Sequence, residues 1–177
     1  VFSACVFAQN RMPQIPPDKQ NPEQKKAFDM VTKTRGPAGA SGPFIPLLRS
    51  PEFMNRIQAV GEYLRFHNTL PQKLVEMTIL MTARHLTQQY EWDSHYPLAM
   101  KAGLKPELAA AIAAGRHPEG MADDEDMMYN FATEVLQNKS VSDATYSRMV
   151  AKFGEQGVID GAGTVGYYIT IGTVLNV

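Results

Sequence analysis

Apolar residues recur at helical spacing through most of the chain, and Gly and Pro residues divide them into separate segments. Asparagine or serine followed directly by proline is a common helix start, and it predicts helices over 22–34 and 51–66. The second of these carries apolar residues at intervals of three and four, which predict one buried stripe. The stripe consists of Phe53, Ile57, Val60 and Leu64.

The segment 72–96 contains no Gly or Pro, so its pattern alone predicts one long helix. Its first half is almost entirely apolar, apart from Glu76. A carboxylate in such a run is costly to bury unless it is paired or functional. Its second half is polar and aromatic. This change of character along one segment indicates that chemistry is concentrated here.

The rest of the chain predicts shorter helices and loops. The Gly- and Pro-rich stretch 36–46 predicts a loop whose Phe44, Ile45 and Leu47 dock into the domain, because it lacks the Gly-Lys-Ser/Thr ending of a phosphate-binding loop. A short helix is expected over 106–115. A second helix is expected over 127–136, preceded by acidic residues that favour its N-terminus, and a third runs from a Ser142 cap to about 153. The final segment, 158–177, is rich in β-branched residues, and propensity alone predicts a strand there.

Glu91 and His95 are four residues apart, so on a helix they share a face. A carboxylate beside an imidazole orients the ring and favours its charged form. Trp92 and Tyr96 form a second pair of the same spacing on a neighbouring face. The alternative is an ordinary surface pair, worth only about 0.2–0.5 kcal/mol. A metal site is conceivable from Glu76, Glu91 and His95, but no Cys or second His accompanies them on that face, so we predict none.

The same stretch resembles the core motif of the carboxymuconolactone decarboxylase and alkylhydroperoxidase-D superfamily. The peroxidase branch has a Glu, eleven residues, Cys-x-x-Cys, three residues and a His, and this spacing runs here from Glu76 to His95. The flanking sequences LPQKLVE and HYPLAMKAGL are also similar, and the resemblance extends over roughly 44–176. The two cysteine positions hold Gln88 and Glu91. Without that thiol pair, a disulfide-based peroxidase cycle is not expected.

The resemblance implies an all-α fold of seven or eight helices in a single domain over 21–177, assembled as a homo-oligomer such as a trimer or hexamer. It also implies a break around 85–90, because Glu76 and His95 on one straight helix would be about 28 Å apart. On the same ground the terminal segment is expected to be a long buried helix, contrary to its strand propensity. Its apolar character makes it the expected oligomer interface.

The function implied is a cofactor-free lyase, a decarboxylase, or an isomerase that transfers protons on a small carboxylated or lactone substrate. Its candidate catalytic residues are His95 as proton donor, Glu91 as its partner and Glu76 as a second acid or base. Candidate substrate-binding residues are Gln88, Tyr90, Trp92 and Arg49, with Arg65 as a further cation that suits a carboxylate. Two alternatives remain open: a non-catalytic binding or scaffold protein of the same fold, and a peroxidase-related redox protein.

The composition and charge of the chain limit the classes of partner that are expected. The sequence has 177 residues, a net charge of −1 and a single cysteine, Cys5. Nucleic acid is therefore not an expected partner, and no disulfide framework is possible within the chain. No stretch is expected to reach the length of a membrane-spanning helix.

The first residues, VFSACVFAQN, are similar to the end of an export signal, with Val6 and Ala8 placed for cleavage before Gln9. Phe2 to Cys5 also forms a weak lipoprotein box. The residues 1–20 are thus expected to be a signal remnant or tether. A periplasmic or secreted location is favoured, and the alternative is a cytoplasmic protein that starts at Met12.

Overall fold

The computed structural model describes residues 11–36 and 41–177, and all regular structure in them is helical. The all-α fold class is therefore confirmed. After a 3₁₀ turn at Pro17–Lys19, the described helices are α1 (Pro22–Arg35), α2 (Phe44–Leu47), α3 (Pro51–Phe66), α4 (Gln72–His85), α5 (Gln89–Lys101), α6 (Pro106–Ala113), α7 (Asp123–Asn138) and α8 (Asp143–Asn176). The expected helices over 22–34 and 51–66 are confirmed within a residue at each end.

Contacts divide the chain into two compact units, one ending at Asn55 and including Val177, the other covering 56–176. In the smaller unit, the Asn21 side chain accepts a hydrogen bond from the backbone N–H of Gln24 and so caps α1. The predicted signal and Cys5 lie outside the described residues. The expected domain boundary after residue 20 and the location of the protein stay predictions.

Part of the expected loop over 36–46 is helical instead. Its last residues form the one-turn helix α2, with the backbone N–H of Leu47 bonded to the carbonyl of Pro43. Proline at position 43 fixes a φ angle that a helical turn needs. The Gly and Pro content of the stretch predicts a loop, and so it does not reveal this turn. Phe44 and Leu47 are buried, as expected, whereas Ile45 is half-buried.

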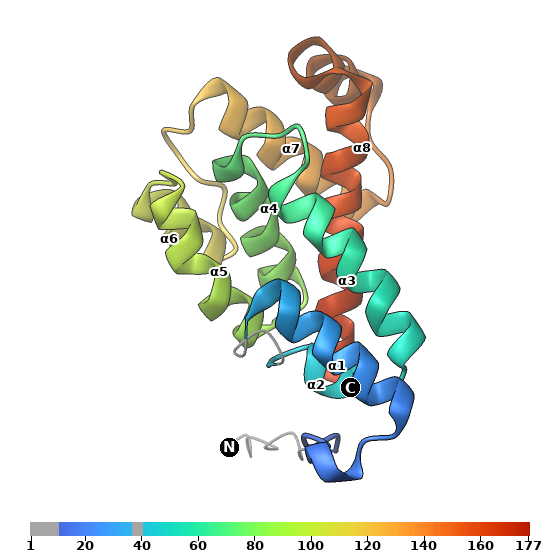
Figure 1. Ribbon diagram of the computed structural model, residues 1–177. Coiled ribbons are helices and arrows are strands. Elements are labelled where there is room, and N and C mark those ends of the chain that lie inside the picture. The colour runs from blue at the N-terminus through green and yellow to red at the C-terminus, as the bar shows by residue number, and fades with distance from the viewer. Residues whose placement is uncertain (1–10, 37–40) are drawn as a thin grey trace, which may run out of the picture. The chain divides into compact units, whose positions relative to one another are not determined.

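In the larger unit, α4 is the central element. Its ten residues from Leu74 to Ala83 are all buried, and it packs against α5, α6, α7 and α8 (Figure 1). An apolar helix that is covered on every side needs no amphipathic pattern. Any polar side chain on it must find its partner inside the protein.

The buried face of α3 differs from the predicted stripe. Phe53 is 41% exposed and Val60 46%, while Leu64 is buried as predicted. Gly61 lies against the Tyr167 ring of α8, at a distance that leaves no room for a Cβ atom. Because this small residue allows α3 and α8 to approach closely, the contact face is centred on it rather than on the apolar stripe.

The expected break between Glu76 and His95 is confirmed. α4 ends at His85 and α5 starts at Gln89, with Thr87 at φ 54° between them. A β-branched residue rarely adopts a positive φ, so no residue type in this stretch announced the turn. The Gln88 side chain caps α5 by accepting from the backbone N–H of Tyr90 at 2.8 Å.

The terminal segment is helical, so the resemblance was right here and the strand propensity was wrong. α8 contains a non-helical residue, Gly154, at φ 69° and ψ 175°, close to the predicted end of the preceding helix. Beyond this kink, Gly161 lies against the Phe131 ring and Gly163 against Leu64. These small residues bring α8 close to its neighbours, so packing outweighs the intrinsic preference of its β-branched residues.

A buried acid on α8 also fixes the connection between α3 and α4. The Asp160 carboxylate accepts from the backbone N–H and the hydroxyl of Thr69, at 3.0 and 2.9 Å, and from the Tyr63 hydroxyl at 3.0 Å. Three donors satisfy most of the carboxylate's hydrogen-bonding capacity. Asp160 thereby holds the loop that leads into α4, which carries Glu76.

By length and composition, α8 is the helix in the described residues that could cross a membrane, and half of its most apolar window is buried inside the protein. The expectation that no stretch reaches the length of a membrane-spanning helix is therefore wrong. α8 is longer than expected because it continues through its glycine residues. A core helix meets the same two criteria. The rest of that window is not buried within the chain, and Ile159 and Ile169 on this helix are 70% and 36% exposed. An oligomer interface on α8 therefore stays a prediction.

The kink at Gly154 gives a test of this fold. The variant Gly154→Ala should lower the free energy of unfolding by about 1–3 kcal/mol, because only glycine adopts its backbone angles without strain. Gly166→Ala is the matched control, since an added Cβ at that helical position meets nothing within 4 Å. It should raise stability by up to about 1 kcal/mol. Urea denaturation measures both, and equal effects would contradict the kink.

Candidate active site

Glu76, Glu91 and His95 converge between α4 and α5. The distance from His95 Nδ1 to Glu76 Oε2 is 2.7 Å, and that from His95 Nε2 to Glu91 Oε2 is 3.5 Å. The three residues are only 1%, 4% and 5% exposed, respectively. The imidazole thus lies between two carboxylates in the interior, brought together by the break after α4.

The remaining hydrogen bonds define the state of the imidazole. Gln72 Nε2 donates to Glu76 Oε1 at 2.7 Å, so both oxygens of this carboxylate are paired. An ionised carboxylate only accepts, so His95 Nδ1 must carry the proton that it donates to Glu76. In the neutral ring, Nε2 is then an acceptor. The Tyr168 hydroxyl lies 3.2 Å from it and can donate.

Tyr168 is buried on α8, and its ring meets the imidazole edge-on with the ring centres 5.0 Å apart. Burial raises the pKa of its phenol well above the usual range. The hydroxyl therefore keeps its proton at all physiological pH values and can serve as a donor to His95.

Glu91 is the acid most affected by its surroundings. Burial raises the pKa of its carboxyl, and the attraction of His95 and of Arg65 opposes that rise only in part. A raised pKa at a group beside an imidazole is typical of acid–base sites, although structural networks also produce it.

A pocket of about 310 Å³ reaches this cluster through Glu76. Glu76 and Gln72 form part of its wall, Arg65 and Lys101 add two cations, and Phe66 and Leu98 add apolar surface. The Nε atom of Arg65 is buried, and no other described residue accepts a hydrogen bond from it. His95 is not part of this wall, so Glu76 separates the imidazole from the pocket.

The predicted substrate-binding residues fall in different places. Gln88 is buried, and besides capping α5 its Nε2 donates to Asn176 Oδ1 at 2.8 Å. Gln88 and Trp92 line a second pocket, of about 370 Å³, while Tyr90 is 42% exposed. Arg49 belongs to the smaller unit, where its guanidinium donates to the backbone carbonyls of Ile45 and Pro13. Their roles toward a substrate stay predictions.

The described residues contain no group of three or more His, Cys, Asp or Glu side chains arranged to hold a metal ion. In the candidate site, Glu76 and His95 bond to each other. Their contacts suit proton exchange between an acid and a base.

The comparison with known families bears on the same segment. Residues 51–124 match the family model described as carboxymuconolactone decarboxylase family. The resemblance to this family is confirmed. The match contains Glu76, Gln88, Glu91 and His95, and so covers the α4–α5 hairpin that builds the site. No curated protein matches the chain.

Two residues of the site were missed by sequence reasoning. Tyr168 lies beyond the segment that matches the carboxymuconolactone decarboxylase family, in a stretch where strand propensity misled, and nothing local linked it to His95. Gln72 had a signal, because it precedes Glu76 by one helical turn and such pairs commonly form hydrogen bonds.

The raised pKa of Glu91 predicts a stability effect. Ionisation of this buried carboxyl opposes folding, so its contribution is most favourable below pH 4.5 and is lost as pH rises through the folded-state pKa. We predict that Glu91→Gln is more stable than the wild type at neutral pH, and that this advantage fades as the pH falls toward 4.5. Urea denaturation at a series of pH values measures it.

Glu134 provides a control of opposite sign. Hydrogen bonds from the Ser142 backbone and the Thr145 hydroxyl lower the pKa of its carboxyl, so its ionised form supports folding above pH 4.5. Glu134→Gln should therefore lose stability at neutral pH and approach the wild type in acid. The same sign of effect for both variants would contradict the assignment of Glu91 as a buried, unfavourably ionised acid.

The hydrogen bond from Tyr168 to His95 predicts a spectroscopic change. Removing the hydroxyl in Tyr168→Phe leaves a buried acceptor unpaired and should cost about 1–2 kcal/mol of stability. Nitrogen-15 NMR should show His95 protonated at Nδ1 in the wild type and a shifted Nε2 signal in the variant. Tyr167→Phe, at the neighbouring buried tyrosine, should leave both nitrogen signals unchanged. An unaltered Nε2 signal in Tyr168→Phe would refute the bond.

Proposed function

We propose that the protein is a cofactor-free proton-transfer enzyme, a decarboxylating lyase or an isomerase, acting on a small carboxylated or lactone substrate. The observation that carries this proposal is the position of Glu76, which lines a pocket on one side and accepts a hydrogen bond from buried His95 on the other. An acid–base pair at the wall of a pocket is the arrangement that substrate proton transfer requires. Similarity to the carboxymuconolactone decarboxylase family supports the same class of reaction.

The composition of the pocket supports an anionic substrate. Arg65 and Lys101 place two positive charges in its wall, and the unpaired Nε of Arg65 offers a donor that a carboxylate or lactone oxygen would satisfy. Phe66 and Leu98 suit the carbon skeleton. A cation beside the substrate carbonyl also stabilises the negative charge that develops on its oxygen as a carbanion forms.

The proposed reaction assigns a role to each acid and base. In a decarboxylation, the bond from carbon to the leaving carboxylate breaks and its electron pair enters the conjugated carbonyl system as an enolate. In the reactive state the His95 ring is cationic and transfers its Nδ1 proton to Glu76, which delivers a proton to the carbon, so that the ring is left neutral. Glu91 faces the other imidazole nitrogen at 3.5 Å and stabilises the cationic ring. Solvent returns the proton, so no oxidant or reductant is consumed.

The convergence of the three residues favours an enzyme over a non-catalytic scaffold. Burying two carboxylates and an imidazole is costly, and a protein that only needed the fold would gain stability from apolar residues there. A peroxidase-type cycle receives no support, because Gln88 and Glu91 occupy the cysteine positions and the sequence has one cysteine in all.

A substrate screen with lactones and with β-keto and β,γ-unsaturated acids tests the proposal, with carbon dioxide release and deuterium uptake from solvent as readouts. His95→Ala should reduce turnover at least about 100-fold, as expected for loss of a general acid–base group. Glu76→Gln and Glu91→Gln should also be strongly impaired. His117→Ala removes an exposed histidine elsewhere in the larger unit and should turn over like the wild type. Undiminished turnover by His95→Ala would refute the mechanism.

A further inference from the structure

A third pocket, of about 180 Å³, lies between α4, α6 and α7 and has no residue in common with the Glu76 pocket. Its walls are two helix faces and a turn. Met81, Arg84 and His85 recur at helical spacing near the end of α4, and Tyr129, Thr133 and Leu136 do so on α7. The turn after α6 closes it between Ile112 and Arg116.

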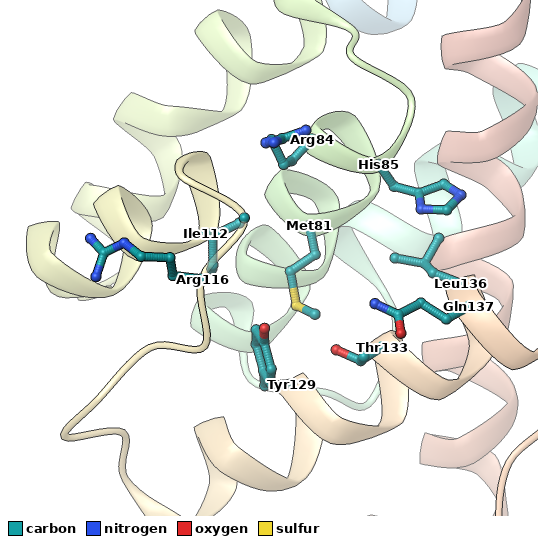
Figure 2. Close-up of a pocket in the computed structure, with 10 residues that line it drawn as sticks. Met81, Arg84, His85, Ile112, Arg116, Tyr129, Thr133, Leu136 and Gln137 are labelled. Carbon is teal, nitrogen blue, oxygen red and sulfur yellow. The ribbon is translucent and has the colours of Figure 1, made fainter.

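The floor of this pocket is apolar and its rim is polar. Met81, Ile112 and Leu136 are buried and form the floor. In Figure 2 the polar ends of Thr133 and Gln137 point from α7 toward Met81. Within the described part of the chain, neither side chain has a hydrogen-bond partner. A concave apolar surface with a few convergent polar groups is the usual form of a small-molecule site.

Arg84 supplies a positive charge that is held in place. Its Nε donates to the carbonyl of Ala113 at the end of α6, at 2.7 Å. Gly115, at φ 67°, leaves room for the guanidinium, because a Cβ there would lie 3.2 Å from Nη2. The two terminal nitrogens have no partner among the described residues, so a planar donor pair is available to a ligand. Arg84 also lines the pocket beside Gln88 and Trp92, so its charge lies at the boundary between the two pockets.

The charges around the pocket have one sign. Arg84, His85 and Arg116 line it, and no Asp or Glu is among the described residues of its wall. The guanidinium of Arg116 points away from Met81, so Arg84 is the arginine considered for a ligand in this pocket (Figure 2). A free phosphate would gain nothing from the apolar floor, whereas a carboxylate on a short apolar body matches both parts.

We infer that this pocket binds a small organic carboxylate, with the carboxylate on Arg84 and the apolar body on Met81, Ile112 and Leu136. The site is separate from the proposed catalytic pocket and does not depend on its activity. Benzoate is a suitable probe because it joins a carboxylate to a compact apolar ring. Benzamide has almost the same shape without the charge.

Backbone amide NMR of the wild-type protein, titrated with benzoate at constant ionic strength, locates the ligand. Amide signals over 133–137 should shift, because these residues of α7 line this pocket and neither of the others. Benzamide or inorganic phosphate should shift them far less. Shifts confined to 87–92 or 98–102 would place benzoate in the other pockets and overturn the inference. Absence of any benzoate-dependent shift would overturn it equally.

Variants separate the charge of Arg84 from its structural bond to Ala113. Arg84→Gln should weaken benzoate binding about tenfold, the change expected on loss of about 1.4 kcal/mol of interaction. Arg84→Lys also loses the bond to Ala113 but keeps the charge, so it should bind more tightly than Arg84→Gln. Arg148→Gln, at an exposed arginine paired with Asp126, should bind like the wild type. Unchanged affinity in Arg84→Gln would contradict the site.

Discussion

The hydrogen bond between His95 and Glu76, 2.7 Å long and buried between α4 and α5, is the interaction on which the candidate site depends. It joins residues nineteen positions apart, so it exists only because the chain reverses at Thr87 and Gln88. The turn in its place requires a threonine with a positive φ. Such strain is typical of sites that the surrounding structure holds in place, and here the cap from Gln88 to Tyr90 supports it.

Because the hydrogen bond between Glu76 and His95 is buried, the other polar atoms of these two side chains must also find partners inside the protein. A carboxylate removed from water is tolerated when its oxygens are paired, and Gln72 and His95 supply one donor to each oxygen of Glu76. Nε2 of His95 faces both the Tyr168 hydroxyl and the Glu91 carboxylate. It cannot accept a hydrogen bond from Tyr168 and donate one to Glu91 at the same time. The neutral ring accepts from Tyr168, whereas the cationic ring donates toward Glu91. The protonation state of His95 therefore selects between two hydrogen-bond arrangements that the same fold allows.

Sequence reasoning located the cluster but could not assemble it alone. The spacing of Glu91 and His95 placed them on one face, and Glu76 stood out as a lone charge, yet the absence of Gly and Pro predicted a straight helix. The break came from the family resemblance, as did the helical state of α8. The shifted face of α3 and the role of Tyr168 depend on which small residues let helices approach, as Gly61 does for Tyr167. Such contacts between distant segments leave no local pattern.

The two positions that hold cysteines in the peroxidase branch have separate roles in this chain. Gln88 is tied to the Tyr90 backbone and to Asn176, which makes it part of the support of the turn. Glu91 lies 3.5 Å from His95 Nε2, and burial raises the pKa of its carboxyl, so a carboxyl group occupies the position where that branch has a thiol. From the pocket inward the order is Glu76, His95, then Glu91 and Tyr168. In the proposed mechanism a proton that leaves His95 for the pocket passes through Glu76, because Glu76 lines that pocket and His95 does not.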